Sequence, residues 1–263
     1  MKKGTKTSAF ATATDAVAQA KLCIEPSHTS YRLAFSDHDL LLKDELRGIR
    51  LQLEWMKPDL VLDEQSINST LVIFGSARFN PSTAASNSQQ AAYYDIARIL
   101  AKKVSELSLK HNGNEFVVTT GGGPGIMEAA NRGAAEVGAK SIGLNIVLPC
   151  EQQPNPYVSP ELCFQFHYFA MRKMHFLKRA KGLVAFPGGF GTLDELFETL
   201  TLLQTRKISP LPVILVGRHY WQRVIDFDFL VEQGAIAESD LKLLSFVDSA
   251  EEAFAILKRA WVA

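Results

Sequence analysis

The residues with the clearest chemical potential lie in GLVAFPGGFGTLDELFE, residues 182–198. This segment has the pattern of a short apolar strand, a glycine-rich turn and an acidic helix start. Such a turn brings backbone N–H groups close to a ligand, and it contains three glycines, Gly188, Gly189 and Gly191. Thr192 can cap the helix or offer its hydroxyl to a phosphate, and Glu195 follows one turn later. The pattern indicates an anion site beside a carboxylate, although a plain strand-to-helix corner explains the same glycines.

Two further glycine-rich corners follow apolar, β-branched runs. In FVVTTGGGPGIMEAANRGA, which starts at residue 116, the corner contains Gly121, Gly122, Gly123, Pro124 and Gly125. In TLVIFGSARFNP, residues 70–81, it contains Gly75, Ser76 and Arg78. Ligands of doubly wound folds bind where the carboxyl ends of strands meet. Three corners of this kind predict a site for a nucleotide or phosphoester.

The spacing of these glycines disfavours the two common nucleotide motifs. A dinucleotide fingerprint requires a third glycine where this chain has Ile126, and an acid about twenty residues further on. The next apolar run, SIGLNIVLP, contains no acid. No glycine-rich corner ends in the Gly-Lys-Ser/Thr of a P-loop. The remaining candidate is a smaller phosphorylated ligand that is held mainly by backbone N–H groups.

A second charged group precedes the first corner, in FHYFAMRKMHFLKRAKG, residues 166–182. The cations near its carboxyl end complement a helix dipole and are explained by structure alone. Arg172 lies near the helix start, where the dipole disfavours a cation, and is therefore a functional candidate. His167 and His175 are acid–base candidates by residue type, but lone histidines in an aromatic helix are more typical of core or surface positions.

Together these segments resemble the Lonely Guy (LOG) family. The resemblance rests on MRK at 171–173 followed by PGGFGTLDE at 187–195. TGGGPGIMEAANRGA and FGSAR resemble the other two nucleotide-contacting loops of that family. Its members are nucleoside 5′-monophosphate phosphoribohydrolases, many once labelled possible lysine decarboxylases. The match extends over about residues 68–250 and leaves the preceding extension unaccounted for.

The resemblance implies a role for individual positions. Arg172 matches the catalytic arginine of the family and Glu195 its catalytic glutamate. The implied substrate-binding positions are Gly75, Ser76, Gly121, Gly122, Gly123, Gly125, Glu151, Lys173, Gly188, Gly189, Phe190, Gly191 and Thr192. Glu128, in place of the glycine of many members, resembles bacterial members more than the commonest plant pattern.

The residue chemistry is consistent with cleavage of a ribose N-glycosidic bond. Such a reaction passes through an oxocarbenium-like state, which a carboxylate stabilises while it positions or deprotonates a water. In this interpretation Glu195 is that carboxylate, residues 188–192 hold the 5′-phosphate and Arg172 orients both substrate and Glu195. The substrate is AMP or a cytokinin ribotide, and the reaction requires no metal or redox cofactor.

Two other functions compete with hydrolysis. A non-catalytic nucleotide or molybdenum-cofactor carrier would share the fold but would not require the pair Arg172 and Glu195. A pyridoxal-phosphate decarboxylase needs a Schiff-base lysine with a paired aspartate. The lysines here lie on surface-like helices, away from the glycine-rich corners, so this function is disfavoured.

Composition gives further limits. Lys+Arg and Asp+Glu both number 28, so a formal net charge of zero suggests no bulk attraction to nucleic acid or acidic membranes. The three cysteines, Cys23, Cys150 and Cys163, have no metal-binding spacing and are typical of a reducing cytoplasm. No segment has the pattern of a signal peptide or a membrane span. We therefore expect a cytoplasmic protein.

The order of strand-like and helical patterns predicts the fold class. Strands are expected at 70–75, 115–120, 140–147, 163–166, 182–186, 212–217 and 244–247, and helices at 86–110, 124–137, 168–180, 191–205, 219–233 and 249–261. This alternation predicts an α/β, Rossmann-like, doubly wound parallel sheet with helices on both faces over residues 68–263. Residues 1–67 form an N-terminal extension with an amphipathic helix at 36–56. Its apolar face and the family resemblance both suggest a homodimer. The proline-rich segment 148–160 has the length of a lid.

Overall fold

The computed structural model describes most of the chain, namely residues 12–21, 29–80, 88–149 and 153–262. Its internal contacts divide the chain into two units, Met1–Leu53 and Glu54–Ala263. The larger unit contains the whole sheet and all three glycine-rich corners. The division expected at residue 67 stays a prediction.

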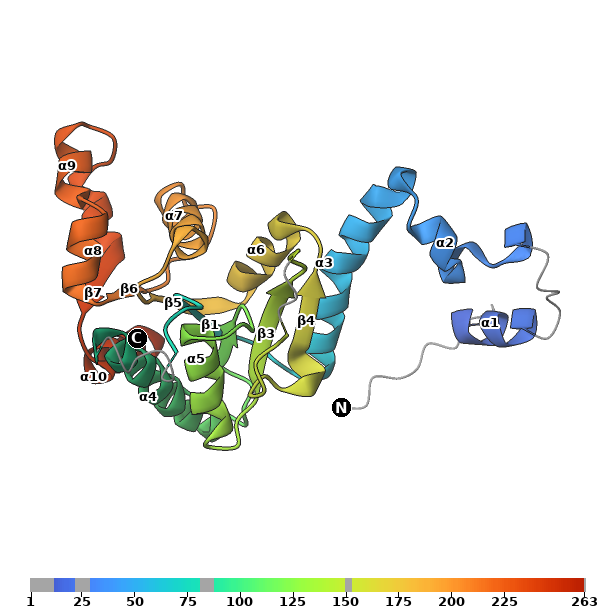
Figure 1. Cartoon of the computed structure of the whole chain (residues 1–263), viewed down its shortest axis with the longest axis horizontal. Helices are drawn as coiled ribbons and strands as arrows, with labels where there is room; N and C mark the ends of the chain where they lie inside the picture. Colours follow the sequence, from blue (N-terminus) through green and yellow to red (C-terminus); the bar gives the residue numbers. More distant parts are fainter. Residues whose placement is uncertain (1–11, 22–28, 81–87, 150–152, 263) are drawn as a thin grey trace. The chain divides into compact units, whose positions relative to one another are not determined.

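Seven parallel strands form the sheet of the larger unit, in the order β4-β3-β2-β1-β5-β6-β7 (Figure 1). They are β1 (Thr70–Phe74), β2 (Val117–Thr120), β3 (Ser141–Ile146), β4 (Cys163–Phe166), β5 (Ala180–Ala185), β6 (Val213–Val216) and β7 (Leu244–Val247). The chain moves outward from β1 to β4 and returns to the other side of β1 at β5. The strands β1 and β5 therefore flank the topological switch point, where open α/β sheets bind ligands.

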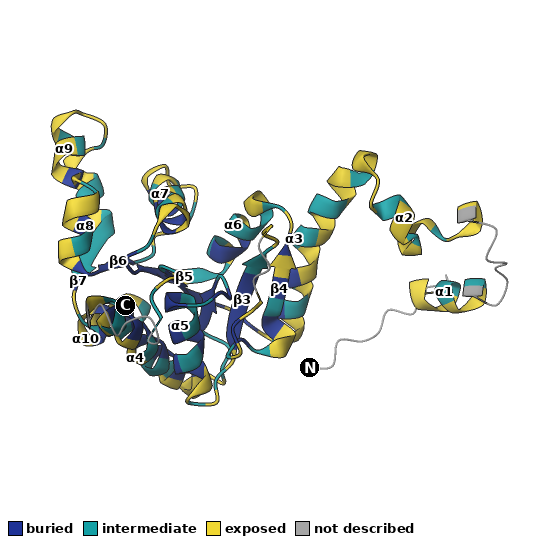
Figure 2. Ribbon diagram, viewed as in Figure 1, coloured by how far each residue is buried: buried dark blue, intermediate teal, exposed yellow. Residues whose placement is uncertain are grey.

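Side chains of each strand alternate between two apolar layers, one on each face of the sheet. In β1, Leu71 and Ile73 enter one layer, whereas Val72 and Phe74 enter the other. Because both faces are covered, β1, β2 and β6 are buried along their whole length, and β6 is dark blue in Figure 2. This double burial explains why the sequence shows continuous apolar runs.

The helices divide between these two layers. The first layer includes side chains of α4 (Ser88–Lys110), α5 (Ile126–Ala135) and α10 (Ala250–Val262). The second includes side chains of α3 (Arg47–Glu64), α6 (Phe169–Lys178), α7 (Phe190–Gln204), α8 (Arg218–Val224) and α9 (Phe227–Glu232). No helix in the described part of the chain is long and apolar enough to cross a membrane.

The predicted α/β fold is confirmed, and each predicted strand lies within two residues of an observed one. One helix prediction in this unit is wrong, because the single helix expected at 219–233 is two helices. The chain is extended at Ile225, and the Asp226 carboxylate then accepts a hydrogen bond from Phe229 N–H (2.9 Å) to cap α9.

The smaller unit contains only short helical segments before α3, namely α1 (Ala13–Lys21), η1 (Thr29–Tyr31), η2 (Ala34–Ser36), α2 (His38–Leu41) and η3 (Asp44–Leu46), among the described residues. The first part of the single helix expected at 36–56 is therefore wrong, because α2 and η3 are separate segments there. Asp37 caps α2 by accepting from Leu40 N–H (3.3 Å). Extended backbone at Lys43 separates α2 from η3.

The helix α3 begins at Arg47 and continues to Glu64, so the end predicted at Met56 is wrong. Pro58 lies inside the helix, although proline removes one hydrogen bond and clashes with the preceding turn. Pro58 and Leu62 are both buried, and this apolar burial offsets the cost of the proline.

Candidate active site

Three glycine-rich corners meet at the switch point of the sheet, and the backbone of Ser76 joins them. The Ser76 N–H donates to the carbonyl of Pro187 (3.0 Å), in the corner after β5. The Ser76 carbonyl accepts from Ile126 N–H (3.1 Å), at the start of α5 after β2. The corners therefore form one continuous edge at the carboxyl ends of β1, β2 and β5.

Two of the corner glycines are required by close approach of the chain. Gly125 has φ of 71°, and a Cβ there would lie 2.7 Å from the carbonyl carbon of Ala77. A Cβ on Gly188 would lie 2.8 Å from the Cβ of Thr192. A side chain on Gly125 would push its corner away from the backbone of Ser76 and Ala77, and one on Gly188 would collide with Thr192 inside its own corner.

We predict that Gly125→Ala destabilises the fold by about 3 kcal/mol, from positive φ and overpacking together. Gly138→Ala is the matched control, because Gly138 also has φ of 70° but no atom lies within 4 Å of its Cβ position. The control is expected to lose about 1 kcal/mol, from backbone strain alone. Urea unfolding measures both losses, and equal losses would contradict the packing argument.

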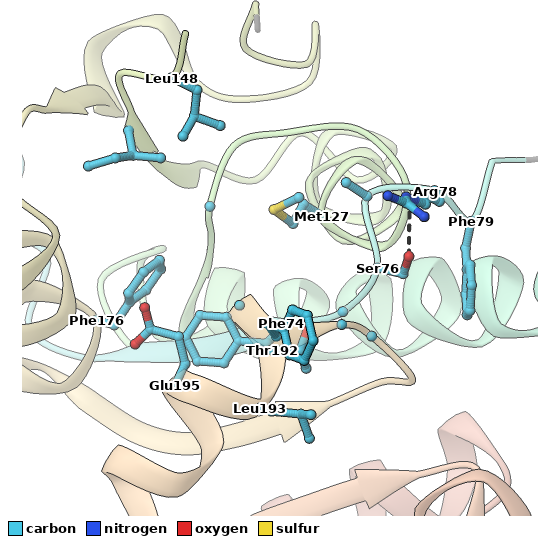
Figure 3. A pocket seen from close by; sticks show the side chains of 18 of the residues that line it. Phe74, Ser76, Arg78, Phe79, Met127, Leu148, Phe176, Thr192, Leu193 and Glu195 are labelled. Atoms are coloured by element: carbon cyan, nitrogen blue, oxygen red, sulfur yellow. Dashed lines mark hydrogen bonds between the residues drawn. The ribbon is translucent and has the colours of Figure 1, made fainter. Parts of the chain in front are cut away.

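The joined corners border a cavity of about 910 Å³ (Figure 3). In Figure 3, Glu195 and Phe176 lie toward one end of the cavity and Ser76, Arg78 and Phe79 toward the other. The sequence-predicted residues that line it are Gly75, Ser76, Gly121, Arg172, Gly188, Gly189, Phe190, Gly191, Thr192 and Glu195. The cavity has the size of a small-molecule site.

The side chains of Arg172 and Glu195 lie close together, although they belong to two different helices. Arg172 lies on α6 and Glu195 on α7, with 3.7 Å between Nη2 and Oε1. Their side chains are only 14% and 6% exposed. Among the described residues neither Arg172 Nε nor Glu195 Oε1 has a hydrogen-bond partner. Buried polar atoms are normally paired, so this arrangement suits a ligand or water that completes it.

Burial sets the charge state of this pair. Burial raises the pKa of Glu195 to about 7, against the opposing attraction of the Arg172 and Lys173 cations. Burial also lowers the pKa of Arg172, although its guanidinium stays charged. Glu195 is therefore a carboxyl that can take up and release a proton near neutral pH.

Aromatic rings hold the guanidinium of Arg172. Its central carbon lies 5.0 Å from the ring centre of Phe169 and 5.7 Å from that of Phe176. The Phe176 ring in turn packs edge-on against Phe74 (4.8 Å). These cation–π contacts orient the charge without using its hydrogen-bond donors, so the donors stay available to a substrate.

Residues 127–257, which include both α6 and α7, match the family described as possible lysine decarboxylase. The chain belongs to this family, the LOG family. Over 167 residues it is 27% identical to the cytokinin riboside 5′-monophosphate phosphoribohydrolase LOG of Oryza sativa subsp. japonica, covering 62% of this chain and 65% of the rice protein.

A second relative of this LOG-family chain is the pyrimidine/purine nucleotide 5′-monophosphate nucleosidase of Escherichia coli strain K12. The two are 34% identical over 113 residues, which is 39% of this chain and 24% of the bacterial protein. The chain thus spans about two thirds of the length of the rice relative and a quarter of the bacterial one.

The fold is shared with the molybdenum cofactor carrier protein MCP of Chlamydomonas reinhardtii. That structure is 20% identical, with a TM-score of 0.51, and the match covers 74% of this chain and 99% of the carrier. At this identity the likeness shows the Rossmann-like fold alone.

Several predicted substrate-binding residues of this LOG-family member lie outside the cavity lining. Gly122 and Gly123 instead accept hydrogen bonds from the buried amide of Asn155, at 3.1 and 3.0 Å. The Lys173 ammonium forms ion pairs with Asp194 and Glu198 on α7, both at 2.8 Å. Gly125 shapes the corner, as described above, and Glu151 lies outside the described residues. The roles predicted for these residues stay predictions.

Arg78, which the sequence placed in the corner with Gly75 and Ser76, also lines the cavity. Other lining residues were not singled out by the sequence as site residues: Phe74, Ala77, Phe79, Gln90, Met127, Asn145, Ile146, Leu148, Phe169, Phe176, Leu193 and Tyr220. The Tyr220 hydroxyl donates to the carbonyl of Gly188 (2.6 Å) and thereby stabilises the glycine-rich corner after β5. A polar residue near the end of an apolar strand was the available signal for Asn145, whereas nothing local points to Tyr220.

The histidines of the α6 segment take structural positions. His175 is buried, and its ring centre lies 4.9 Å from that of Trp55 and 5.6 Å from that of Phe166. Neither His175 nor His167 lines the cavity. Across the described ranges, no group of three or more His, Cys, Asp and Glu side chains could hold a metal ion.

Proposed function

We propose that this LOG-family protein hydrolyses the N-glycosidic bond of a nucleoside 5′-monophosphate. The products are the free base and ribose 5-phosphate. The observation that carries the proposal is a buried carboxyl, Glu195, beside Arg172 on the wall of a cavity bordered by glycine-rich corners. The homology to a phosphoribohydrolase and a nucleotide nucleosidase supports the same class of reaction.

The phosphate of the substrate binds at the start of α7. That helix has 15 residues and begins after Gly189, and its first internal hydrogen bond runs from Thr192 N–H to the Gly189 carbonyl (3.0 Å), so the N–H groups of Phe190 and Gly191 are left without a helical partner. Together with the helix dipole, these groups favour an anion. The base then lies against apolar side chains of the cavity wall, among them Met127, Ile146 and Leu148.

The reaction consumes one water. The ionised Glu195 accepts a proton from that water as its oxygen attacks C1′ of the ribose, and the bond from C1′ to the base nitrogen breaks. The base leaves with the bonding electrons and takes up a proton. The carboxylate also stabilises the positive charge that develops on the ribose, while the Arg172 guanidinium orients Glu195 and the substrate.

Purified protein incubated with AMP or a cytokinin ribotide, followed by chromatography of the free base, tests the proposal. Release of base with an equal amount of ribose 5-phosphate is the expected result. Binding without turnover of any nucleoside monophosphate would favour the carrier function. A decarboxylase with a Schiff-base lysine gains no support, since no lysine of the described residues lines the cavity.

The rate of base release is expected to depend on pH. Burial raises the pKa of Glu195 to about 7, and the ionised form is the active one in this mechanism. The value of kcat/KM should therefore rise with pH and reach half its plateau near pH 7. The substrate phosphate itself titrates near pH 6. Ribose 5-phosphate carries the same kind of phosphate, so the pH dependence of its inhibition distinguishes titration of the phosphate from titration of Glu195. A rate that falls as pH rises through 7 would make Glu195 an acid instead.

We further infer a cytoplasmic homodimer that acts on a nucleoside monophosphate without a nucleic-acid or membrane partner. The formal net charge of zero supports the absence of a nucleic-acid partner. Sedimentation of the purified protein measures its oligomeric state, and a monomer at micromolar concentration would contradict the dimer.

A further inference from the structure

Helix α3 makes polar contacts with both ends of helix α6. The family match covers residues 127–257, so it includes α6 but not α3. Residues 54–63 of α3 belong to the same structural unit as the sheet. This contact therefore joins the candidate active site to a segment that precedes the first strand.

At the start of α6, Glu54 accepts two backbone hydrogen bonds. His167 N–H donates to one carboxylate oxygen of Glu54 (2.8 Å), and Tyr168 N–H donates to the other (3.1 Å). Tyr168 is the residue that precedes the first turn of α6 and has no side-chain cap of its own. A carboxylate at a helix start also matches the helix dipole.

At the end of α6, two cations contact the acids of α3. Lys178 donates to Asp59 (2.6 Å), and Arg179 donates to Asp59 (2.7 Å) and to Asp63 (2.8 Å). The guanidinium of Arg179 is only 15% exposed. Cations at a helix end complement the dipole in the same way as Glu54 does at the start.

Aromatic contacts fill the space between these two ends. The Trp55 ring packs against His175 of α6 at a tilt of 36°, with 4.9 Å between ring centres, and the Lys178 ammonium lies 4.4 Å from the centre of the Trp55 ring. Helix α3 thus contacts the α6 segment just before its first turn, at His175 and at its end.

We propose that Glu54 is a positioning residue for Arg172, and that residues 54–63 of α3 are required for full activity. The peptide of Tyr168 connects the two residues, because its N–H donates to Glu54 while its carbonyl accepts from Arg172 N–H (3.3 Å). Phe169, which packs on the Arg172 guanidinium, is the next residue. The kinetic part of this proposal rests on the proposed hydrolase function.

The experiment compares Glu54→Ala, Glu54→Gln and Glu64→Ala in the full-length protein. Glutamine keeps one acceptor oxygen and should retain one of the two hydrogen bonds. Glu64 is exposed on the same helix and makes no polar contact among the described residues, so Glu64→Ala is the matched control. Circular dichroism confirms that each variant is folded.

In Glu54→Ala, kcat for AMP is expected to fall about 10- to 100-fold, because small displacements of catalytic groups have effects of this size. The KM should change less than about threefold, since the phosphate site belongs to α7. The midpoint of the pH profile should move upward as the attraction of Arg172 for the Glu195 carboxylate weakens. Glu54→Gln should recover most of the loss in kcat, and Glu64→Ala should match the wild type.

Backbone hydrogen exchange at residues 167–172 gives a readout that does not depend on turnover. Exchange there should become at least about tenfold faster in Glu54→Ala and stay unchanged in Glu64→Ala. A wild-type kcat in a folded Glu54→Ala variant would overturn the proposal, and so would unchanged exchange. A wild-type protein that hydrolyses no nucleotide would instead refute the proposed function, and the exchange data would still report whether Glu54 holds α6.

Discussion

Glu195→Gln is expected to lower kcat for base release by about 10³-fold, because the amide can neither accept the proton of the water nor stabilise the ribose cation. The loss should appear in kcat and kcat/KM alike, because the interaction forms in the transition state. Glu198→Gln, one turn further along α7, is the matched control. Its carboxylate pairs with Lys173 and does not line the cavity. Near-wild-type turnover of Glu195→Gln would refute the mechanism.

The substitution Glu195→Gln is also expected to stabilise the fold at high pH. Burial raises the pKa of Glu195 from its ordinary 4.5 to about 7, so the folded state binds the proton more tightly than the unfolded chain. Stability is therefore lost as pH rises from about 4.5 to 7, by about 3 kcal/mol in total. Glutamine carries no charge, and its gain should be about 3 kcal/mol at pH 8 but less than about 1 kcal/mol at pH 5. Urea unfolding at both pH values measures the difference, and equal gains would contradict the role of burial.

Arg172→Ala is the second large effect, with an expected loss of about 10²- to 10³-fold in kcat. Removal of the cation also removes the attraction that opposes burial, so the pKa of Glu195 should rise further and the pH profile should move above 7. Arg172→Lys keeps the charge but not the planar group between Phe169 and Phe176, and should lose less. An unchanged pH profile in Arg172→Ala would contradict the coupling.

The strands could be predicted because their local signals agree. Most are apolar runs that end in a glycine corner or a polar turn, and burial of the inner strands on both faces demands that composition. The end of α3 could not be predicted, because the burial of Pro58 and Leu62 overrides the usual effect of proline. The break at Ile225 was missed although Asp226 is an ordinary cap residue.

The candidate site was predictable in its residue types but not in its charge state. The glycine corners and the pair of Arg172 and Glu195 stand out in the sequence, the pair through a family resemblance. The raised pKa of Glu195 depends on burial between α6 and α7, which residue type does not reveal. The contact of Glu54 with His167 joins positions 113 residues apart and has no local signature.

The sequence by itself determined the fold class and the membership of the LOG family, and it predicted a phosphorylated ligand at the glycine corners. These follow from patterns within segments, where spacing and composition act locally. The tertiary structure alone decided which corners share a cavity, how deeply Glu195 is buried and which helix holds α6. Those properties depend on contacts between segments that are distant in the chain, and the order β4-β3-β2-β1-β5-β6-β7 is what brings them together.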